Sequence, residues 1–294
     1  MAFFAWVVVY GALAGAIYAL IALAFVVVYK SSHAINFAVG EWVMFGALLT
    51  ASGLHVLGLG LWGGILFASA GMVGLAWLFG RLVLQRMQGR SLMALIMLTL
   101  GLGTLMRGVG PIIFKGTPNA ITLPFERDYV DVLGLTLPPE RIFCAAVAGL
   151  CIAAVSWFYR RTRTGLALRA LAESHVVAMA SGIDVGRHIT ITWGLAGLVS
   201  VAAGVLWTMV SGGGIGTVLV GLKVFPIVII GGLNSIPGCI VGAMVIGVAE
   251  SLASAYLDPL VGSGTSIVVS SLLLIGMLWL RPQGLFGERL VARV

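Results

Sequence analysis

Ionisable side chains that could carry chemistry are few in this sequence, and they lie singly inside long apolar runs. Glu250 is a lone carboxylate within such a run. A carboxylate in a membrane is costly unless it is paired, protonated or hydrated, so this residue is either hydrogen-bonded to a neighbouring helix or in contact with a solute. Arg107 and Lys223 lie near the ends of apolar runs, and we interpret them as side chains that extend to the interface.

Catalytic and metal-binding arrangements are absent from the sequence. No nucleophile stands with a general base, no lysine follows a glycine-rich phosphate loop, and no histidine has a metal-ligand companion. The cysteines lie within apolar runs without ligand spacing, and we interpret them as packing residues; they are Cys144, Cys151 and Cys239. The sequence therefore predicts no catalytic residue, no metal site and no cofactor bound by this chain. Any uphill transport would draw its energy from another chain.

Two segments interrupt the apolar runs, one in each half of the chain. The first runs from Ser31 to Glu41, and the second is the glycine-rich segment from Ile230 to Gly238. Polar groups this close to lipid must line a cavity or lie at the interface, and a pair of interrupted helices is typical of transport sites. We interpret both segments as candidates for the transport pathway, with ordinary interfacial turns as the alternative. With the lone carboxylate added, the candidate pathway residues are Asn36, Phe37, Gly40, Glu41, Gly231, Gly232, Asn234, Ser235 and Glu250.

A more polar stretch between two apolar runs predicts a short amphipathic helix from Leu168 to Ser181. Its apolar residues recur at spacings of three and four, whereas its polar residues lie elsewhere around the helix. The apolar positions are Leu168, Leu171, Ala172, His175 and Met179, and the polar ones are Arg169, Glu173 and Ser174. Gly182 is expected to end the helix. A helix this short and charged cannot span, so it must lie on the membrane surface or dock into a partner.

The composition requires that lipid or other helices surround most of these side chains. Of the 294 residues, 60% are apolar and only 9% are charged, and the mean hydropathy is +1.12. A soluble domain of this length has about 25% charged residues. No run shows the alternation that a membrane β-barrel requires. The sequence therefore predicts an all-α, polytopic transmembrane helix bundle with some broken helices, forming a single membrane domain over residues 1–294.

Nine apolar runs reach or approach the roughly 20 residues that cross a membrane. The runs are Trp6–Tyr29, Trp42–Leu57, Leu61–Gly80, Leu92–Phe114, Ile142–Tyr159, His188–Val210, Val218–Gly232, Gly238–Leu257 and Thr265–Leu280. The second and the seventh are short and are bounded by Gly, Asn or Pro. The sequence therefore predicts about nine spans, with eight or ten as alternatives.

The net charge of +7 comes mainly from basic clusters between the apolar runs. This pattern indicates loops held on the cytoplasmic side of a membrane, not a nucleic-acid surface. The clusters are Arg81, Arg86 and Arg90; Arg160, Arg161, Arg163, Arg169 and Arg187; and Arg281, Arg289 and Arg293. The loop at 115–141 mixes both signs of charge and is predicted to be periplasmic. Counting spans back from these loops places the N-terminus outside, although one miscounted span would reverse this.

Four segments, in this order, carry a family resemblance. INFAVGE at 35–41 resembles the signature INFAHGE, and the stretch at 163–183 resembles a cytoplasmic coupling stretch. IGGLNSIPG at 230–238, followed by Gly247 and Glu250, resembles LGGxGSxxGA…G…E, and RPQGLFG at 281–287 resembles RPxGLFG. Their order and spacing are similar to those of the branched-chain amino-acid permease family of bacterial ATP-binding-cassette importers, over nearly the whole chain.

This resemblance implies a permease subunit, multi-pass in the bacterial inner (cytoplasmic) membrane, that forms the pathway for branched-chain or similar small amino acids. The implied partners are a second homologous permease subunit in a heterodimer, two cytoplasmic ATPase subunits that bind ATP and Mg, a periplasmic solute-binding protein and membrane lipid, but no nucleic acid. The helix at 168–182 would dock into an ATPase. The implied ATPase-coupling residues are Arg169, Ala172, Glu173, Met179 and Gly182.

Two positions depart from the family pattern. Val39 replaces the signature histidine, and Asn234 replaces a glycine of the second interrupted segment. Either change is compatible with a different solute, so urea, amides and aromatic acids are alternatives to the branched-chain amino acids. A stand-alone secondary transporter and a membrane-embedded enzyme are the rival classes. The first would move solute without ATP or partners, and the second would need a catalytic cluster that the sequence does not supply.

Overall fold

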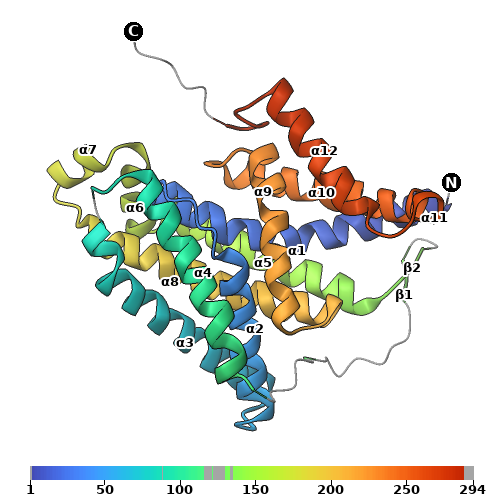
Figure 1. Ribbon diagram of the computed structural model, residues 1–294, viewed down its shortest axis with the longest axis horizontal. Coiled ribbons are helices and arrows are strands. Elements are labelled where there is room, and N and C mark those ends of the chain that lie inside the picture. Colours follow the sequence, from blue (N-terminus) through green and yellow to red (C-terminus); the bar gives the residue numbers. More distant parts are fainter. Residues whose placement is uncertain (1, 88, 116–120, 122–129, 133–134, 288–294) are drawn as a thin grey trace.

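The computed structural model describes residues 2–87, 89–115, 121, 130–132 and 135–287, and these are almost entirely helical (Figure 1). The α-helices are α1 (Ala2–Ser32), α2 (Val39–His55), α3 (Gly60–Leu82), α4 (Leu92–Ile113), α5 (Pro139–Arg161), α6 (Arg163–Glu173), α7 (His175–Ala180), α8 (Val185–Ser211), α9 (Val220–Gly231), α10 (Ile236–Tyr256), α11 (Asp258–Val261) and α12 (Thr265–Leu280). The remaining elements are the 3-10 helices η1 (Leu84–Met87) and η2 (Ile215–Leu219) and the strands β1 (Val130–Val132) and β2 (Leu135–Leu137).

Each of the nine apolar runs forms a helix. Among the described residues, six helical stretches are long and apolar enough to cross a membrane: Phe3–Ser32, Gly60–Met87, Leu92–Ile113, Pro139–Arg161, Val185–Ser211 and Ile236–Tyr256. The helix α2 has 17 residues, and α12 and the stretch formed by η2 and α9 are also shorter than these six. The prediction of an all-α, multi-pass membrane bundle is confirmed, whereas the predicted number of about nine crossings stays a prediction.

The helix α1 is the centre of the bundle and lies antiparallel along α10 (Figure 1). Glycines bring the two backbones together. A Cβ atom on Gly11 would lie 2.7 Å from the carbonyl oxygen of Gly247, and one on Gly15 would lie 2.9 Å from that of Ala243. Because lipid gives little hydrophobic drive between helices, close packing through small residues holds them together.

A second group of helices, α2, α3 and α8, packs beside α1. A Cβ atom on Gly204 of α8 would lie 2.4 Å from the carbonyl oxygen of Val43 in α2. The rings of Trp42 and Trp193 are fully buried between these helices, with centroids 5.4 Å apart. The start of α2 contacts η2 and α9, since a Cβ atom on Gly40 would meet the carbonyl oxygen of Val218 in η2 and would lie 3.0 Å from the Cα of Gly221 in α9. The helix α2 therefore begins inside the bundle, beside the start of α9.

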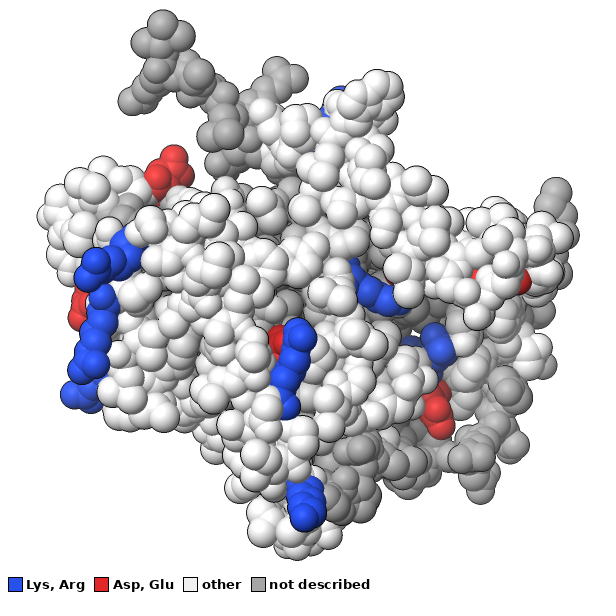
Figure 2. Space-filling view, in the orientation of Figure 1, with Lys and Arg blue, Asp and Glu red and all other residues white. Residues whose placement is uncertain are grey.

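Arginine-rich helix ends gather at one end of the molecule, which we call the basic end. It contains α6, α7, the end of α3 and the start of α8, at the left of Figures 1 and 2. Five of its cations line two cavities; these are Lys30, Arg160 and Arg169 in one, and Arg81 and Arg187 in the other. This grouping agrees with the predicted placement of the basic clusters on one side of the membrane; which side that is stays a prediction.

The opposite end holds the N-terminus, the hairpin of β1 and β2, and α11 (Figure 1). The indole N–H of Trp6 donates to the carbonyl oxygen of Thr136 at 2.9 Å, which fixes the hairpin to α1. Within the predicted periplasmic loop at 115–141, residues 116–120, 122–129 and 133–134 lie outside the described residues. The C-terminal arginines at 289 and 293 also lie outside them. The hairpin of this loop and Arg141 lie at the end opposite to the basic end (Figure 1), and the periplasmic location of the loop stays a prediction.

The predicted amphipathic helix from Leu168 to Ser181 is not continuous, so this part of the prediction is wrong. It is divided into α6 and α7 at Ser174, whose backbone is extended, with φ −161° and ψ 118°. The hydroxyl of Ser174 accepts a hydrogen bond from the N–H of Val177 at 3.4 Å and begins a new helix. Serine competes for backbone hydrogen bonds in this way, which interrupts a helix that its apolar spacing favours. Gly182 follows the end of α7 with φ +80°, as predicted.

Candidate functional site

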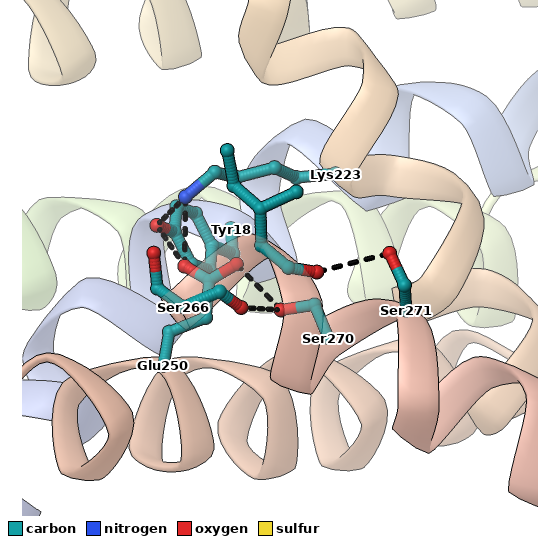
Figure 3. A network of polar contacts seen from close by, with 7 residues as sticks. Tyr18, Lys223, Glu250, Ser266, Ser270 and Ser271 are labelled. Atoms are coloured by element: carbon teal, nitrogen blue, oxygen red, sulfur yellow. Dashed lines mark hydrogen bonds and ion pairs between the residues drawn. The ribbon is translucent and has the colours of Figure 1, made fainter. Parts of the chain in front are cut away.

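A buried cluster of polar side chains joins four helices near the middle of the bundle (Figure 3). We call it the Lys223–Glu250 cluster; it consists of Tyr18 of α1, Lys223 of α9, Glu250 of α10 and Ser270 of α12. The Lys223 ammonium donates to Glu250 Oε2 at 2.7 Å and to the Tyr18 hydroxyl at 2.9 Å. The Tyr18 hydroxyl donates to the same Oε2 at 2.8 Å. Ser270 Oγ donates to Oε1 at 2.8 Å.

The cluster solves the problem of a carboxylate inside a membrane helix. The Glu250 side chain is only 7% exposed, and both of its oxygens accept hydrogen bonds. A carboxylate left buried without any partner is strongly destabilising, and here Lys223, Tyr18 and Ser270 together compensate its charge. The sequence suggested that Lys223 extends to the membrane interface. Its side chain instead turns inward to Glu250 and is 29% exposed. The sequence left two interpretations of Glu250 open, a hydrogen bond to a neighbouring helix or contact with a solute. The structure shows hydrogen bonds to neighbouring helices.

The cluster borders a cavity of about 390 Å³. Aromatic rings line its walls toward the N-terminal end of the molecule, and they belong to Trp6, Tyr10 and Trp207. The Arg141 guanidinium lies 4.0 Å from the centroid of the Tyr10 ring, a cation–π contact. Serine hydroxyls add further polar groups, and they belong to Ser211, Ser251, Ser254 and Ser266. A mainly apolar cavity with a few convergent polar groups is the usual form of a small-molecule site.

A second buried carboxylate, Glu41 of α2, forms an ion pair with Arg107 of α4. The Glu41 side chain is 1% exposed, whereas that of Arg107 is 57% exposed on the outer side of α4. Gly103 leaves room for the carboxylate, because a Cβ atom there would lie 3.2 Å from Glu41 Cδ. Both cations that the sequence placed at membrane interfaces thus pair with a buried carboxylate.

The first interrupted segment is a turn held by its own polar groups. Asn36 Oδ1 accepts a hydrogen bond from the N–H of Ala38 at 3.0 Å. The N–H of Phe37 donates to Thr99 Oγ1 of α4 at 3.3 Å, and its ring centroid lies 4.9 Å from that of Phe225 in α9. This segment therefore connects α1, α4 and α9, and its polar groups are engaged within the protein.

The second interrupted segment lies at the basic end, away from the first. Gly231 and Gly238 touch, since a Cβ atom on Gly231 would lie 2.2 Å from the carbonyl oxygen of Gly238. Gly232 has φ +105° and directs the chain into the turn, a conformation that glycine adopts at little cost. Ser235 Oγ accepts a hydrogen bond from the N–H of Gly238 at 3.0 Å and caps α10. Asn234 and Ser235 line the cavity that contains Arg169.

The predicted pathway residues are thus in three places. The segment at 31–41 is beside the start of α9, the segment at 230–238 is at the basic end, and Glu250 is in the Lys223–Glu250 cluster. The sequence analysis missed Tyr18 and did not pair Lys223 with Glu250. A signal for this pair was present, because these two are the only charged residues between 188 and 257.

The predicted coupling residues lie on α6, α7 and the turn after them. Leu168 and Leu171 are fully buried within this chain, so this part of the predicted apolar face is not free for a partner. The helix α7 instead exposes apolar side chains, which we call the α7 patch: Val176, Val177 and Met179. Arg169, Glu173 and Gly182 are exposed, and Ala172 is half-buried.

Known proteins resemble this chain along almost its full length. Residues 7–280 match the family described as branched-chain amino acid transport system / permease component. The high-affinity branched-chain amino acid transport system permease protein LivH of Escherichia coli (strain K12) is 29% identical over 301 residues, covering 97% of this chain and 96% of the relative. The corresponding protein BraD of Pseudomonas aeruginosa is 28% identical over 303 residues, with the same coverage.

A solved structure also matches, at lower similarity. It is described as PsaBC from Streptococcus pneumoniae in complex with Fab, and its chain is 16% identical, covers 93% of this chain and 91% of its own length, and has a TM-score of 0.44. This score is too low to establish a shared fold.

Proposed function

The chain belongs to the family of permease components of branched-chain amino acid transport systems, and we propose that it forms the translocation pathway of an ATP-driven importer for small zwitterionic amino acids. The observation that carries the choice of solute is the Lys223–Glu250 cluster at the cavity of about 390 Å³. An amino acid carries one carboxylate and one ammonium group. Lys223 and Glu250 offer one charge of each sign at the same cavity.

The ion pair discriminates between the solute classes that the sequence left open. A zwitterion binds by exchanging partners: its carboxylate takes Lys223 and its ammonium takes Glu250, so neither buried charge is left alone. Urea and amides have no charge with which to replace either partner. An aromatic acid satisfies Lys223 but brings a second anion close to Glu250. The cavity also has apolar walls, including Ile17, Trp207 and Val210, against which an aliphatic side chain packs.

The arginine-rich ends support a cytoplasmic basic end, because positive loops are retained on that side. The cavity lies toward the other end, beside Trp6 and Arg141, where a periplasmic binding protein would deliver solute. We assign nine crossings, in which α2, α9 with η2, and α12 are the short ones. The 17 residues of α2 span only about 25 Å, and α2 begins inside the bundle, as expected for a broken helix. The bacterial inner membrane is the location that this arrangement fits.

Coupling to ATP hydrolysis is assigned to α6 and α7. The α7 patch is exposed next to Glu173 and Gly182, at the basic end. A helix of six residues with exposed apolar side chains cannot cross the membrane, and docking against a cytoplasmic ATPase subunit covers it. ATP and Mg²⁺ would bind to those partner subunits. This chain would contribute a pathway with two alternative arrangements, whose balance the partner controls.

The exposure of Arg107 favours the presence of a second permease subunit. This cation is 57% exposed on α4, a helix whose other outward side chains are mainly apolar, such as Met97 and Leu105. A charged side chain facing lipid in a spanning helix is costly. A second, homologous permease that covers the outer face of α4 would remove this cost.

The decisive experiment compares single and double replacements of the ion pair in the complete importer, reconstituted in vesicles with its ATPase and binding-protein partners. Lys223→Met and Glu250→Met each leave one buried charge, and each is expected to reduce leucine uptake at least about 100-fold. The double variant Lys223→Met/Glu250→Met leaves no unpaired charge and is expected to fold about as well as the native protein. Its uptake is expected to stay as low as that of the single variants.

Recovery of uptake in the double variant would contradict the proposal, because the pair would then serve the structure alone. Uptake of urea or benzoate in preference to leucine by the native importer would also contradict it. A further control omits the ATPase subunits. Leucine uptake that persists without them would favour a stand-alone secondary transporter and would remove the ATP-driven part of the proposal.

A further inference from the structure

The cavity beside the Lys223–Glu250 cluster is elongated along α1 and extends beyond the cluster. From Trp6 to Tyr18 the wall that α1 provides rises about 18 Å along the helix axis. The facing helix α10 contributes residues from Gly247 to Ala255. The α1 residues of the wall recur at spacings of three and four, which places them in one stripe along the helix; they are Trp6, Val7, Tyr10, Ala14, Ile17 and Tyr18. The cavity therefore has two ends, and the cluster lies at one of them.

A cation lies over a tyrosine ring of α1 at each end of this cavity. Lys223 Nζ is 5.1 Å from the centroid of the Tyr18 ring, and the Arg141 guanidinium is 4.0 Å from that of the Tyr10 ring. The two tyrosines are eight residues apart, a rise of about 12 Å along α1. The same arrangement of cation and ring is thus repeated about two helical turns apart, and both cations line the cavity.

Aromatic packing fixes the position of the cation at the second end. Trp6 stacks on Tyr10, with ring centroids 4.8 Å apart, and its indole N–H donates to the carbonyl oxygen of Thr136 in β2. Arg141 is in the first turn of α5, which follows β2 along the chain. A ring attracts a cation through its face and brings no net negative charge of its own. This contact therefore keeps the positive charge for a carboxylate, with which guanidinium groups form paired hydrogen bonds.

We propose that Arg141, Tyr10 and Trp6 form an outer subsite, which binds the carboxylate of an incoming amino acid before the Lys223–Glu250 cluster does. The inference rests on the proposed import of amino acids and assigns a second position on the same path. The guanidinium of Arg141 binds the carboxylate, and the two rings cover the apolar side chain. The carboxylate then passes to Lys223, about two turns further along α1. Two weak positions in series let a solute enter and leave, which one tight site would hinder.

The test measures equilibrium binding of radiolabelled leucine to the purified complex of this chain with its permease and ATPase partners, without the binding protein. Lys223→Met/Glu250→Met removes the inner position, so the leucine that still binds reports the outer subsite. Adding Arg141→Gln is expected to weaken this remaining binding at least about 10-fold. Adding Arg141→Lys, which keeps the charge without the paired hydrogen bonds, is expected to weaken it only about 3-fold. Leucinol, which has no carboxylate, is not expected to compete.

The matched control is Arg86→Gln, which removes an exposed cation of η1, directly after α3. Added to Lys223→Met/Glu250→Met, it is expected to leave leucine binding unchanged, and a loss equal to that of Arg141→Gln would overturn the proposal in favour of general charge. Complete loss of leucine binding in Lys223→Met/Glu250→Met itself would also overturn it, because no separate position would then exist.

Two further results would contradict the outer subsite. Unchanged leucine binding after addition of Arg141→Gln, together with a lowered Tm, would assign Arg141 to the packing of α5 against α1 alone. Competition by leucinol as strong as that by unlabelled leucine would show that the carboxylate is not recognised. Failure of the proposed function is distinguishable from these results, since it would appear as leucine uptake that recovers in Lys223→Met/Glu250→Met whichever residue is present at position 141.

Discussion

The two buried carboxylates differ in their partners and in their surroundings. Glu41 and Glu250 are 1% and 7% exposed, and each has one basic partner. Glu250 accepts hydrogen bonds from three side chains on three other helices, and it borders a cavity. Glu41 is bound by Arg107 alone among the hydrogen bonds found in the described residues, and that cation faces outward from α4.

Under the proposed function, this difference separates a pair that would exchange partners with a solute from a pair that would not. Tyr18 and Ser270 each donate a hydrogen bond to Glu250, so in the proposed exchange they would hold the carboxylate when Lys223 turns to the solute. At Glu41, loss of the guanidinium would leave a buried charge with no substitute. We therefore expect the first pair to determine transport and the second to determine the stability of the contact between α2 and α4.

The largest effect on stability is expected for Arg107→Met. It leaves Glu41 buried without its cation and should lower the free energy of unfolding by about 3–5 kcal/mol. Thermal unfolding of the purified protein measures this, and Glu41→Met/Arg107→Met should recover most of the loss. Arg81→Met, which removes an exposed cation 5.4 Å from the Trp77 ring, is the control and should cost less than about 1 kcal/mol. A loss for Lys223→Met as large as that for Arg107→Met would contradict the distinction between the two pairs.

A smaller effect is expected for Tyr18→Phe, which removes one of the groups that hold Glu250. The lost hydrogen bond, 2.8 Å long, joins a hydroxyl to a carboxylate, and its loss should cost about 1.5–3 kcal/mol. Leucine affinity should fall as well, because the carboxylate is no longer held in place when Lys223 turns to the solute. The control is Tyr256→Phe, in an exposed tyrosine, expected within about 0.5 kcal/mol of the native protein. Unchanged leucine affinity in Tyr18→Phe would show that Tyr18 does not prepare the site.

The contact between α1 and α10 is expected to set the geometry of the cluster, since Tyr18 and Glu250 lie on these two helices. A Cβ atom on Gly247 would lie 2.5 Å from the carbonyl oxygen of Gly11, so Gly247→Ala must push the helices apart. We expect a loss of about 1–3 kcal/mol together with reduced uptake. Gly149→Ala, in α5, meets no atom within 4 Å and should be neutral or slightly stabilising. Normal uptake in Gly247→Ala would show that the cluster tolerates helix separation.

The helices were predictable from the sequence because apolar runs of this length have few alternatives in a membrane. The break at Ser174 was not predictable, because a local hydrogen bond from the N–H of Val177 to the Ser174 hydroxyl competes with the apolar spacing that favours one longer helix. The partners of Glu250 depend on how four helices pack, and spacing along the chain does not specify that packing. Lys223 and Glu250 are nevertheless the only charged residues in the sequence between 188 and 257, and this could have indicated their contact. A single charge in an apolar membrane segment is costly, and pairing two opposite charges lowers that cost.

The smallest effect concerns Asp258, a half-buried carboxylate at the start of α11 that contrasts with the two buried ones. Hydrogen bonds from the Thr265 hydroxyl and then from its backbone N–H lower the pKa of Asp258 below its ordinary value. A lowered pKa in the folded state means that this carboxylate stabilises the fold above the pKa of the unfolded chain, about 4, and loses its effect as the pH falls through the folded pKa. Asp258→Asn should therefore lower the Tm slightly at pH 7, and the difference from the native protein should shrink as the pH falls below about 4. A Tm difference that stayed constant from pH 7 to pH 3 would show that the ionised carboxylate does not stabilise the start of α12.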